Sequence, residues 1–417
     1  MENEAQEETK EASDALVAGN AAHPKPKRTR IRRLGNIVAR IVLALLFAGG
    51  FFLSMLPQGR ATARALLILP TVLLASEPAP LTLVNDPVRY TQMAIPSRDG
   101  TTYLDIYAPT TPAPLFPGTR GGMLIVPGVG DYRGNAVPQL VNLDLALAHT
   151  GLVVINVTAP TLRKYNLSTQ DSDGIVQAFQ LLAHWPGVGA DRVGILGISG
   201  AGPATCLAAT DPRIRDQVAF IALLGSYFDA TTFLRAFGLR ALTVDGRTQP
   251  WHPQSTPLMV MANFIATALP HYDGTLLVHA FTPGGPPLTS GDLAHFSPQG
   301  LAAYHLLKGD EPGQADANIA ALSPAVRTQL AELSPSTFID KIHAPIYLLH
   351  DRNDTSIPFT ESREFAATLA RIHHPYDLAE FGIFEHVEIR SGLGLGQLLG
   401  DAPNLFRILN EVLLPGS

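Results

Sequence analysis

Residues 192–202 read Arg-Val-Gly-Ile-Leu-Gly-Ile-Ser-Gly-Ala-Gly, and this stretch carries most of the information on the fold. The apolar run Val193 to Leu196 predicts a buried strand, and the segment that follows Pro203 predicts a helix. Ser199 lies between them in the chain's single Gly-x-Ser. A serine on such a tight turn is presented at the edge of a sheet as a nucleophile. The alternative is a glycine-rich loop that caps a helix.

From about residue 88 onward, short apolar strands alternate with helical stretches. This alternation predicts an α/β fold with a mostly parallel sheet and helices on both faces. Residues 103–107 alternate between polar and apolar, which favours an edge or antiparallel strand. We expect buried strands at 123–126, 152–157, 193–196, 219–224 and 346–349, a last strand at 378–381, and helices at 136–149, 172–184, 200–210, 359–371 and 402–414.

The strand spacing is interrupted between Leu224 and Ile346, where roughly 120 residues stand in place of a short connection. We expect residues 226–339 to form a helical cap over the C-terminal edge of the sheet, where open α/β folds bind ligands. The hydrolytic core would then comprise 88–225 and 340–417. The cap's aromatic and histidine residues are expected to pack it onto the core, and the cap to shape an apolar pocket.

A nucleophilic serine needs a base, an acid that orients the base, and donors for the oxyanion. Asp354 follows the strand at 346–349, and His386 follows the strand at 378–381. The chain order Ser199, Asp354, His386 is that of an α/β-hydrolase triad. Other candidates remain open: Asp351 as the acid, and His350, His373 or His374 as the base.

The strand at 123–126 runs into Pro127-Gly128-Val129-Gly130-Asp131. Glycines in this loop free the backbone to aim an N–H at a developing oxyanion, and the N–H of Gly200 would be the second donor. An ordinary strand-to-helix turn is the alternative.

These segments give the chain, from about residue 90 to 415, a resemblance to the α/β-hydrolase superfamily, in particular to capped serine hydrolases of the esterase and serine-aminopeptidase-like type. The resemblance implies Ser199 as nucleophile, His386 as base, Asp354 as acid, and the N–H groups of Val129 and Gly200 as oxyanion donors. Three positions depart from the family pattern: Ala201 replaces the last glycine of the serine turn, Pro127 stands where a histidine is common, and Asp351 stands where a glycine is usual.

The N-terminal region predicts a membrane anchor. Residues 1–35 are polar and end in a basic cluster, which predicts a disordered cytoplasmic tail. Residues 36–56 are apolar and long enough to cross a hydrocarbon core of roughly 30 Å as a helix. Residues 57–87 are expected to form an apolar juxtamembrane segment, which lies on the membrane or packs on the domain, and a linker. We expect the catalytic domain on the extracytoplasmic side, with a cleaved signal peptide as the alternative to the anchor.

Composition limits the partners. The 417 residues carry a net charge of −6 without a basic stripe in the body of the chain, so nucleic acid is not an expected partner. Cys206 is the only cysteine and is expected to be a buried packing thiol. No Cys/His spacing indicates a metal site, and no cofactor is expected.

The expected activity is a membrane-anchored serine hydrolase that cleaves a carboxylic ester or thioester through an acyl-enzyme, with a small-molecule or lipid-like acyl substrate. A peptidase on the same triad is one alternative. It would need acidic cap residues to hold a substrate amino terminus, for which the sequence offers only Asp273, Asp292, Asp310 and Glu311. A non-catalytic binding module with a hydrolase fold is the other.

Overall fold

The computed structural model describes residues 41–46, 48–53, 55–74, 87–110, 120–285, 287–390 and 392–417. The chain divides into two units, one that ends at Phe52 and one that extends from Leu53 to Ser417. In the first unit the described residues form a helix with exposed apolar side chains, Ile41–Leu53. The predicted tail at 1–35, the start of the predicted anchor and most of the predicted linker lie outside the described residues.

Among the described residues, no single helix is long and apolar enough to span a membrane. The helix Ile41–Leu53 and the helix Pro57–Leu73 are bent relative to each other. Taken together, they have the length and composition of a membrane span.

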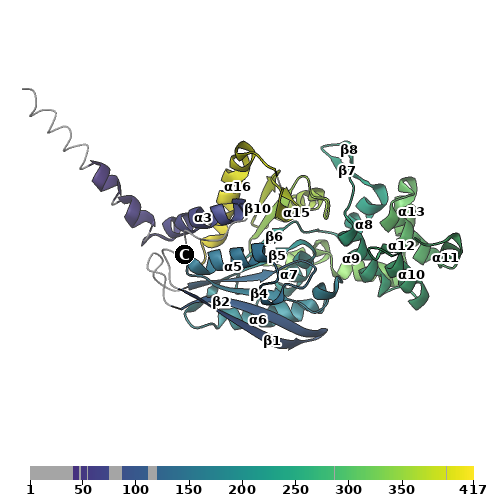
Figure 1. The fold of residues 1–417 in the computed structure, drawn as a ribbon, viewed down its shortest axis with the longest axis horizontal. Coiled ribbons are helices and arrows are strands. Elements are labelled where there is room, and N and C mark those ends of the chain that lie inside the picture. Colours follow the sequence, from purple (N-terminus) through teal and green to yellow (C-terminus); the bar gives the residue numbers. More distant parts are fainter. Residues whose placement is uncertain are drawn as a thin grey trace, which may run out of the picture. The chain divides into compact units, whose positions relative to one another are not determined.

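An eight-stranded sheet forms the centre of the second unit, in the order β1-β2-β4-β3-β5-β6-β9-β10 (Figure 1). β2 pairs antiparallel with β1 and β4, and the strands from β4 to β10 pair in parallel. This order and these directions are those of the α/β-hydrolase fold. The strands are β1 (Val88–Ser97), β2 (Gly100–Pro109), β3 (Arg120–Val126), β4 (Val153–Thr158), β5 (Val188–Ile198), β6 (Val218–Leu224), β9 (Ile346–Asp351) and β10 (Tyr376–Phe381).

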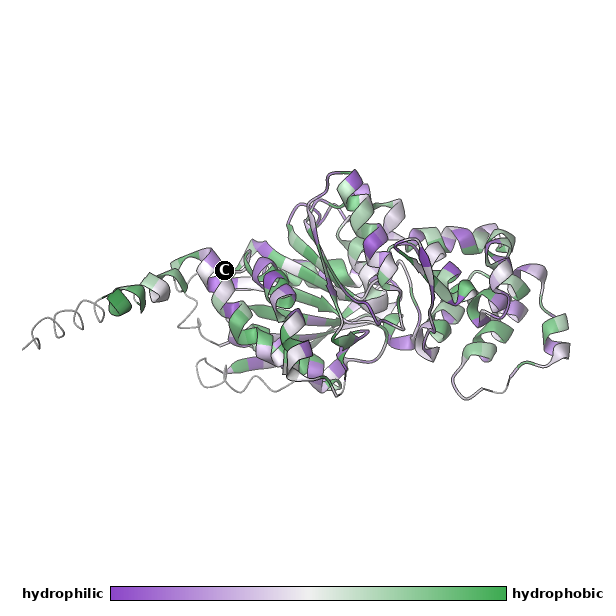
Figure 2. Ribbon diagram, turned by 90° about the horizontal axis from the view of Figure 1, so that it is seen from above, coloured by the Kyte–Doolittle hydropathy of each residue, from purple (hydrophilic) through white to green (hydrophobic). Residues whose placement is uncertain are grey.

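Helices cover both faces of the sheet, and a separate apolar cluster fills the space on each face. Figure 2 shows the strands in the green of apolar residues between helices of mixed colour, because the parallel strands are buried on both faces. One face carries α3 (Pro57–Leu74), α5 (Pro138–His149) and α16 (Leu395–Leu413); the other carries α6 (Asp171–Ala183), α7 (Gly202–Ala208) and α15 (Phe359–Arg371).

The juxtamembrane segment predicted at 57–87 begins as α3, which packs on the domain. Its buried face consists of small and apolar residues, among them Ala61, Ala65 and Ile68. Arg64 is buried as well, and its guanidinium donates hydrogen bonds to the carbonyl oxygens of Thr150 and Gly416. α3 is therefore part of the folded unit.

The chain between β6 and β9 forms the segment predicted as a cap. It contacts loops at the C-terminal edge of the sheet: Trp251 Nε1 donates to the Asp354 carbonyl at 2.9 Å, and Asn263 Nδ2 donates to the Tyr165 carbonyl at 2.9 Å. Its aromatic residues Tyr227, Phe228, Trp251 and Phe296 are buried, as expected for side chains that pack the cap onto the core. The cap elements are α8 (Ala230–Leu239), β7 (Ala241–Val244), β8 (Arg247–Pro250), α9 (Ser255–Ala266), α10 (His271–Phe281), α11 (Ser290–Ala294), α12 (Pro298–Lys308), α13 (Ala315–Ala321) and α14 (Pro324–Glu332).

Several elements differ from the expectations. The strands β1, β7, β8, β11 (Phe384–Glu385) and β12 (Glu388–Ile389) were not expected, and most residues of β1 are exposed, so it lacks a buried apolar run. α16 begins at Leu395, seven residues before the predicted start at 402, and Gly396, Gly400 and Pro403 interrupt the helical pattern of its sequence. The expected strands from β2 onward are present.

Candidate active site

The turn after β5 presents Ser199. The serine has a φ of 54°, in the left-handed region that only a tight turn imposes on a non-glycine residue. A Cβ at Gly197 would lie 3.0 Å from the Thr205 Cβ, and a Cβ at Gly202 would overlap the Ser226 hydroxyl. Ala201 is fully buried in the core. The close approaches around this turn therefore fall at Gly197 and Gly202, and the methyl group at 201 is accommodated.

His386 lies at the tip of a two-residue hairpin between β11 (Phe384–Glu385) and β12 (Glu388–Ile389). It too has a positive φ, of 61°. His386 Nε2 is 2.7 Å from Ser199 Oγ, and His386 Nδ1 is 2.7 Å from Asp354 Oδ2. The structure thus joins the three predicted residues in one chain of hydrogen bonds, with serine and carboxylate on opposite ring nitrogens.

The carboxylate of Asp354 is buried and fully engaged. Its Oδ1 accepts backbone N–H groups from Ser356 at 2.7 Å and Ile357 at 2.9 Å, which fixes its orientation. Burial on its own would raise the pKa of Asp354, but the charge of His386 and the hydrogen bonds from His350 and His386 outweigh burial and hold the pKa below its usual range. The group is therefore an anion at neutral pH, as the acid of a triad must be.

Asp351, the alternative acid, has a different task. Its carboxylate accepts the N–H of Asn353 at 2.7 Å and the N–H of Phe384 at 2.6 Å. Burial raises its pKa. Asp351 therefore ties the acid-bearing turn to the hairpin of His386, and Asp354 is the aspartate that contacts the imidazole.

The rival histidines lie elsewhere. His350 is fully buried and contacts Ser362 Oγ through Nδ1 at 2.7 Å, while its Nε2 lies 3.2 Å from Asp354 Oδ2. His350 therefore supports the acid. His373 is exposed, and His374 contacts the Ala344 carbonyl at 2.8 Å.

The two expected oxyanion donors lie beside the serine. A Cβ built on Gly200 would be 3.7 Å from Val129 Cγ1, and one on Gly128 would be 3.0 Å from the Ser199 Cβ. The loop is held by the N–H of Gly130, which donates to the Leu162 carbonyl at 3.0 Å. The loop and the serine turn therefore lie next to each other.

The sequence reasoning missed Gly225, which follows β6. It has a φ of 60°, and a Cβ there would lie 3.2 Å from His386 Nδ1 and 3.3 Å from Asp354 Oδ2. A glycine directly after a buried apolar strand was the available signal. Its missing side chain leaves the room that the histidine and the aspartate occupy.

Glu361 was missed as well. It is buried at the start of α15 and accepts the N–H groups of Phe228 and Asp229, both at 3.0 Å, and the hydroxyl of Thr232 at 2.6 Å. Burial raises its pKa to about 7. This carboxyl therefore fastens the first turn of the cap to the core.

The acidic cap residues have partners within the cap. Asp273 accepts the N–H of Ser297 at 3.1 Å, Asp292 caps α11, and Asp310 lies 3.0 Å from Lys308 Nζ. Glu311 lies 3.9 Å from His305. Their contacts are structural.

Cys206 is buried and free, and burial raises its pKa.

No model of a protein family matches the chain, and none of the curated proteins matches it. Several solved structures are similar in fold. A puromycin-hydrolyzing peptidase from Mycobacterium tuberculosis is 18% identical, with a TM-score of 0.45, over 79% of this chain and 39% of that one. An acylaminoacyl peptidase from Pyrococcus horikoshii is 15% identical, with a TM-score of 0.47, over 78% of this chain and 41% of that one.

The chain thus spans about two fifths of the length of these proteins. The strand order and the hydrogen bonds from Ser199 through His386 to Asp354 come from this chain alone. On these two observations the protein has the α/β-hydrolase fold, with a serine, a histidine and an aspartate joined at the C-terminal edge of its sheet.

Proposed function

We propose that this protein is a serine hydrolase that works through an acyl-enzyme. The observation that carries the proposal is the pair of 2.7 Å contacts that His386 makes, with Ser199 Oγ on one side and Asp354 Oδ2 on the other. In this arrangement the imidazole takes the serine proton while Oγ attacks a carbonyl carbon, and the Asp354 carboxylate stabilises the imidazolium.

The negative charge that develops on the carbonyl oxygen would be met by the N–H groups of Val129 and Gly200. His386 then gives its proton to the leaving group as the bond to that group breaks, which leaves the acyl group on Ser199. A water molecule, deprotonated by the same imidazole, then attacks the acyl carbonyl. The bond from that carbonyl to Ser199 Oγ breaks, the imidazolium returns its proton to Oγ, and the acid is released. The serine, histidine and aspartate that these steps use lie within hydrogen-bond distance of one another.

An ester or thioester and an amide are the two candidate bonds. The similar structures named above are called peptidases, so amide substrates are tested together with ester substrates. One local observation also favours an amine-bearing substrate: the exposed carboxylates of Glu385 and Glu388 flank His386 and could hold an ammonium group. The four acidic cap residues have partners within the cap and are less suited to that task.

The experiment is labelling with a fluorophosphonate probe. The chain should be labelled, and Ser199→Ala should lose the label together with turnover. Undiminished labelling of Ser199→Ala would refute the assignment. Hydrolysis of p-nitrophenyl esters compared with aminoacyl anilides, with Ser199→Ala as background, then distinguishes the ester from the amide.

Attachment to a membrane through the apolar N-terminal region, with the catalytic domain on the extracytoplasmic side, is part of this proposal. The exposed apolar side chains of the helix Ile41–Leu53 and the basic residues that precede it in the sequence support it. Separation of cell membranes from the soluble fraction, followed by protease treatment of intact cells, tests both points.

A further inference from the structure

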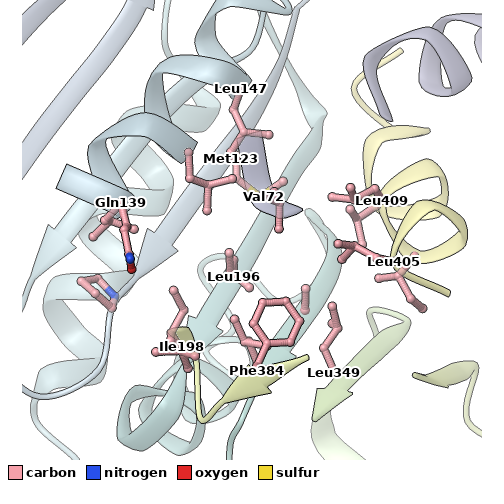
Figure 3. A pocket seen from close by; sticks show the side chains of 18 of the residues that line it. Val72, Met123, Gln139, Leu147, Leu196, Ile198, Leu349, Phe384, Leu405 and Leu409 are labelled. Atoms are coloured by element: carbon pink, nitrogen blue, oxygen red, sulfur yellow. The ribbon is translucent and has the colours of Figure 1, made fainter. Parts of the chain in front are cut away.

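A large apolar cavity lies on the face of the sheet away from the cap contacts, between the strands and the helices α3, α5 and α16 (Figure 3). Its volume is about 250 Å³. Phe220, Ala222 and Leu224 of β6 all line it, as alternate residues of one strand do. At about 3.3 Å per residue, these positions span about 13 Å along the strand. The walls of this cavity are helices other than those of the predicted cap.

The lining is almost entirely hydrocarbon. Among the described residues that line the cavity, Thr71, Tyr132, Gln139 and Glu388 carry the polar side chains. Gln139 and Glu388 are exposed, so they mark a polar mouth between the start of α5 and the His386 hairpin. Val72, Met123 and Leu147 gather at the other end (Figure 3). A cavity with an apolar interior and a polar mouth suits an aliphatic chain better than water.

The cavity starts beside the reacting atoms. Gly128 lines it, and a Cβ at this glycine would lie 3.4 Å from Ser199 Oγ. Ile198, the residue before the serine, points into the cavity, and Phe384 lies next to it (Figure 3). Gly128, which has no side chain, therefore adjoins both the serine and the cavity. Pro127 also lines the cavity. It stands at the position where the capped serine hydrolases that the sequence resembles commonly have a polar histidine.

We propose that this cavity binds the acyl chain of the substrate, so that the enzyme acts on medium-length aliphatic acyl groups. The proposal rests on the proposed acyl-enzyme function, because it places the acyl carbonyl at Ser199 and the chain behind Gly128. At roughly 30 Å³ for each group of water or methylene size, the cavity has room for about eight such groups. That is the length of a medium-chain acyl group.

Substitutions at two depths test the chain-length dependence. In the unmodified enzyme, kcat/KM for p-nitrophenyl esters should rise from butyrate to decanoate, by up to about fourfold for each methylene that the cavity buries. Val72→Trp fills the end far from the serine, and Ala222→Phe fills the middle. Both should lower the decanoate-to-butyrate ratio by about tenfold or more. Leu66→Trp is the matched control, because Leu66 is an exposed residue of the same helix outside the cavity, and its ratio should equal that of the unmodified enzyme.

Binding is measured apart from catalysis by titration calorimetry, with decanoate as the probe and the Ser199→Ala variant as the protein. This variant should bind the probe, and addition of Val72→Trp should weaken the binding by about tenfold or more, whereas addition of Leu66→Trp should not. A flat chain-length profile, or equal probe binding in all three proteins, would overturn the acyl-chain proposal. Fluorophosphonate labelling of Ser199 would still stand in that case. If the unmodified chain bound the probe but was not labelled by the fluorophosphonate, the hydrolase would be refuted and the cavity would remain a binding site.

Discussion

Replacement of Asp354 by asparagine tests which of two aspartates, Asp354 or Asp351, is the acid of the triad, a question that the sequence left open. The variant keeps the shape of the side chain and an oxygen for the backbone N–H groups of Ser356 and Ile357, but it removes the charge next to His386. For unit charges 2.7 Å apart at an effective dielectric constant of about 20, the lost attraction to the imidazolium is about 6 kcal/mol. At 1.36 kcal/mol per factor of ten, this corresponds to about four powers of ten in kcat.

The assay is the hydrolysis of p-nitrophenyl butyrate by Asp354→Asn and by the matched variant Asp351→Asn. In the matched variant, the amide side chain retains an oxygen for the N–H of Phe384, which Asp351 accepts at 2.6 Å, so kcat should fall by about tenfold at most. Thermal melts of both variants control for folding. The assignment of the acid fails if Asp351→Asn loses as much activity as Asp354→Asn, or if Asp354→Asn keeps a tenth of the activity.

Two further predictions concern the cap and the site. The folded pKa of Glu361, about 7, exceeds the unfolded value of 4.5, so the stability that this group contributes is present at low pH and lost as pH rises through 7. Between pH 5 and pH 8, the free energy of unfolding should fall through this group by up to about 3 kcal/mol. Urea unfolding at the two pH values should show that Glu361→Gln removes this difference. Gly225→Ala should lower both stability, by about 1–2 kcal/mol, and kcat. Gly246→Ala, with a φ of 76° and open space around it, should lower stability alone.

The fold and the triad could be predicted because their signals are local. Each of Ser199, Asp354 and His386 follows an apolar run that reads as a strand, and parallel strands bring their carboxyl ends to one edge. The roles of Gly225 and Glu361 could not be predicted in this way. Their partners are distant in sequence, and nothing in their neighbours shows that they meet.

The cavity was not predictable for a similar reason. Its walls combine α3 and α16, which lie at opposite ends of the described chain, and the apolar pattern of each is also that of an ordinary core helix. β1 was not predicted because it is an exposed edge strand. Its sequence lacks the regular alternation of apolar and polar residues that indicates a strand.

The left-handed backbone of Ser199 and His386 has a consequence for protein engineering. Two non-glycine residues that face each other in this conformation, at φ values of 54° and 61°, each hold roughly 1–3 kcal/mol of strain. Glycine or asparagine would relieve that strain at either position. Directed evolution for thermal tolerance alone would therefore favour inactive variants at these two positions, so a library from this scaffold has to be screened for heat resistance and turnover in the same round.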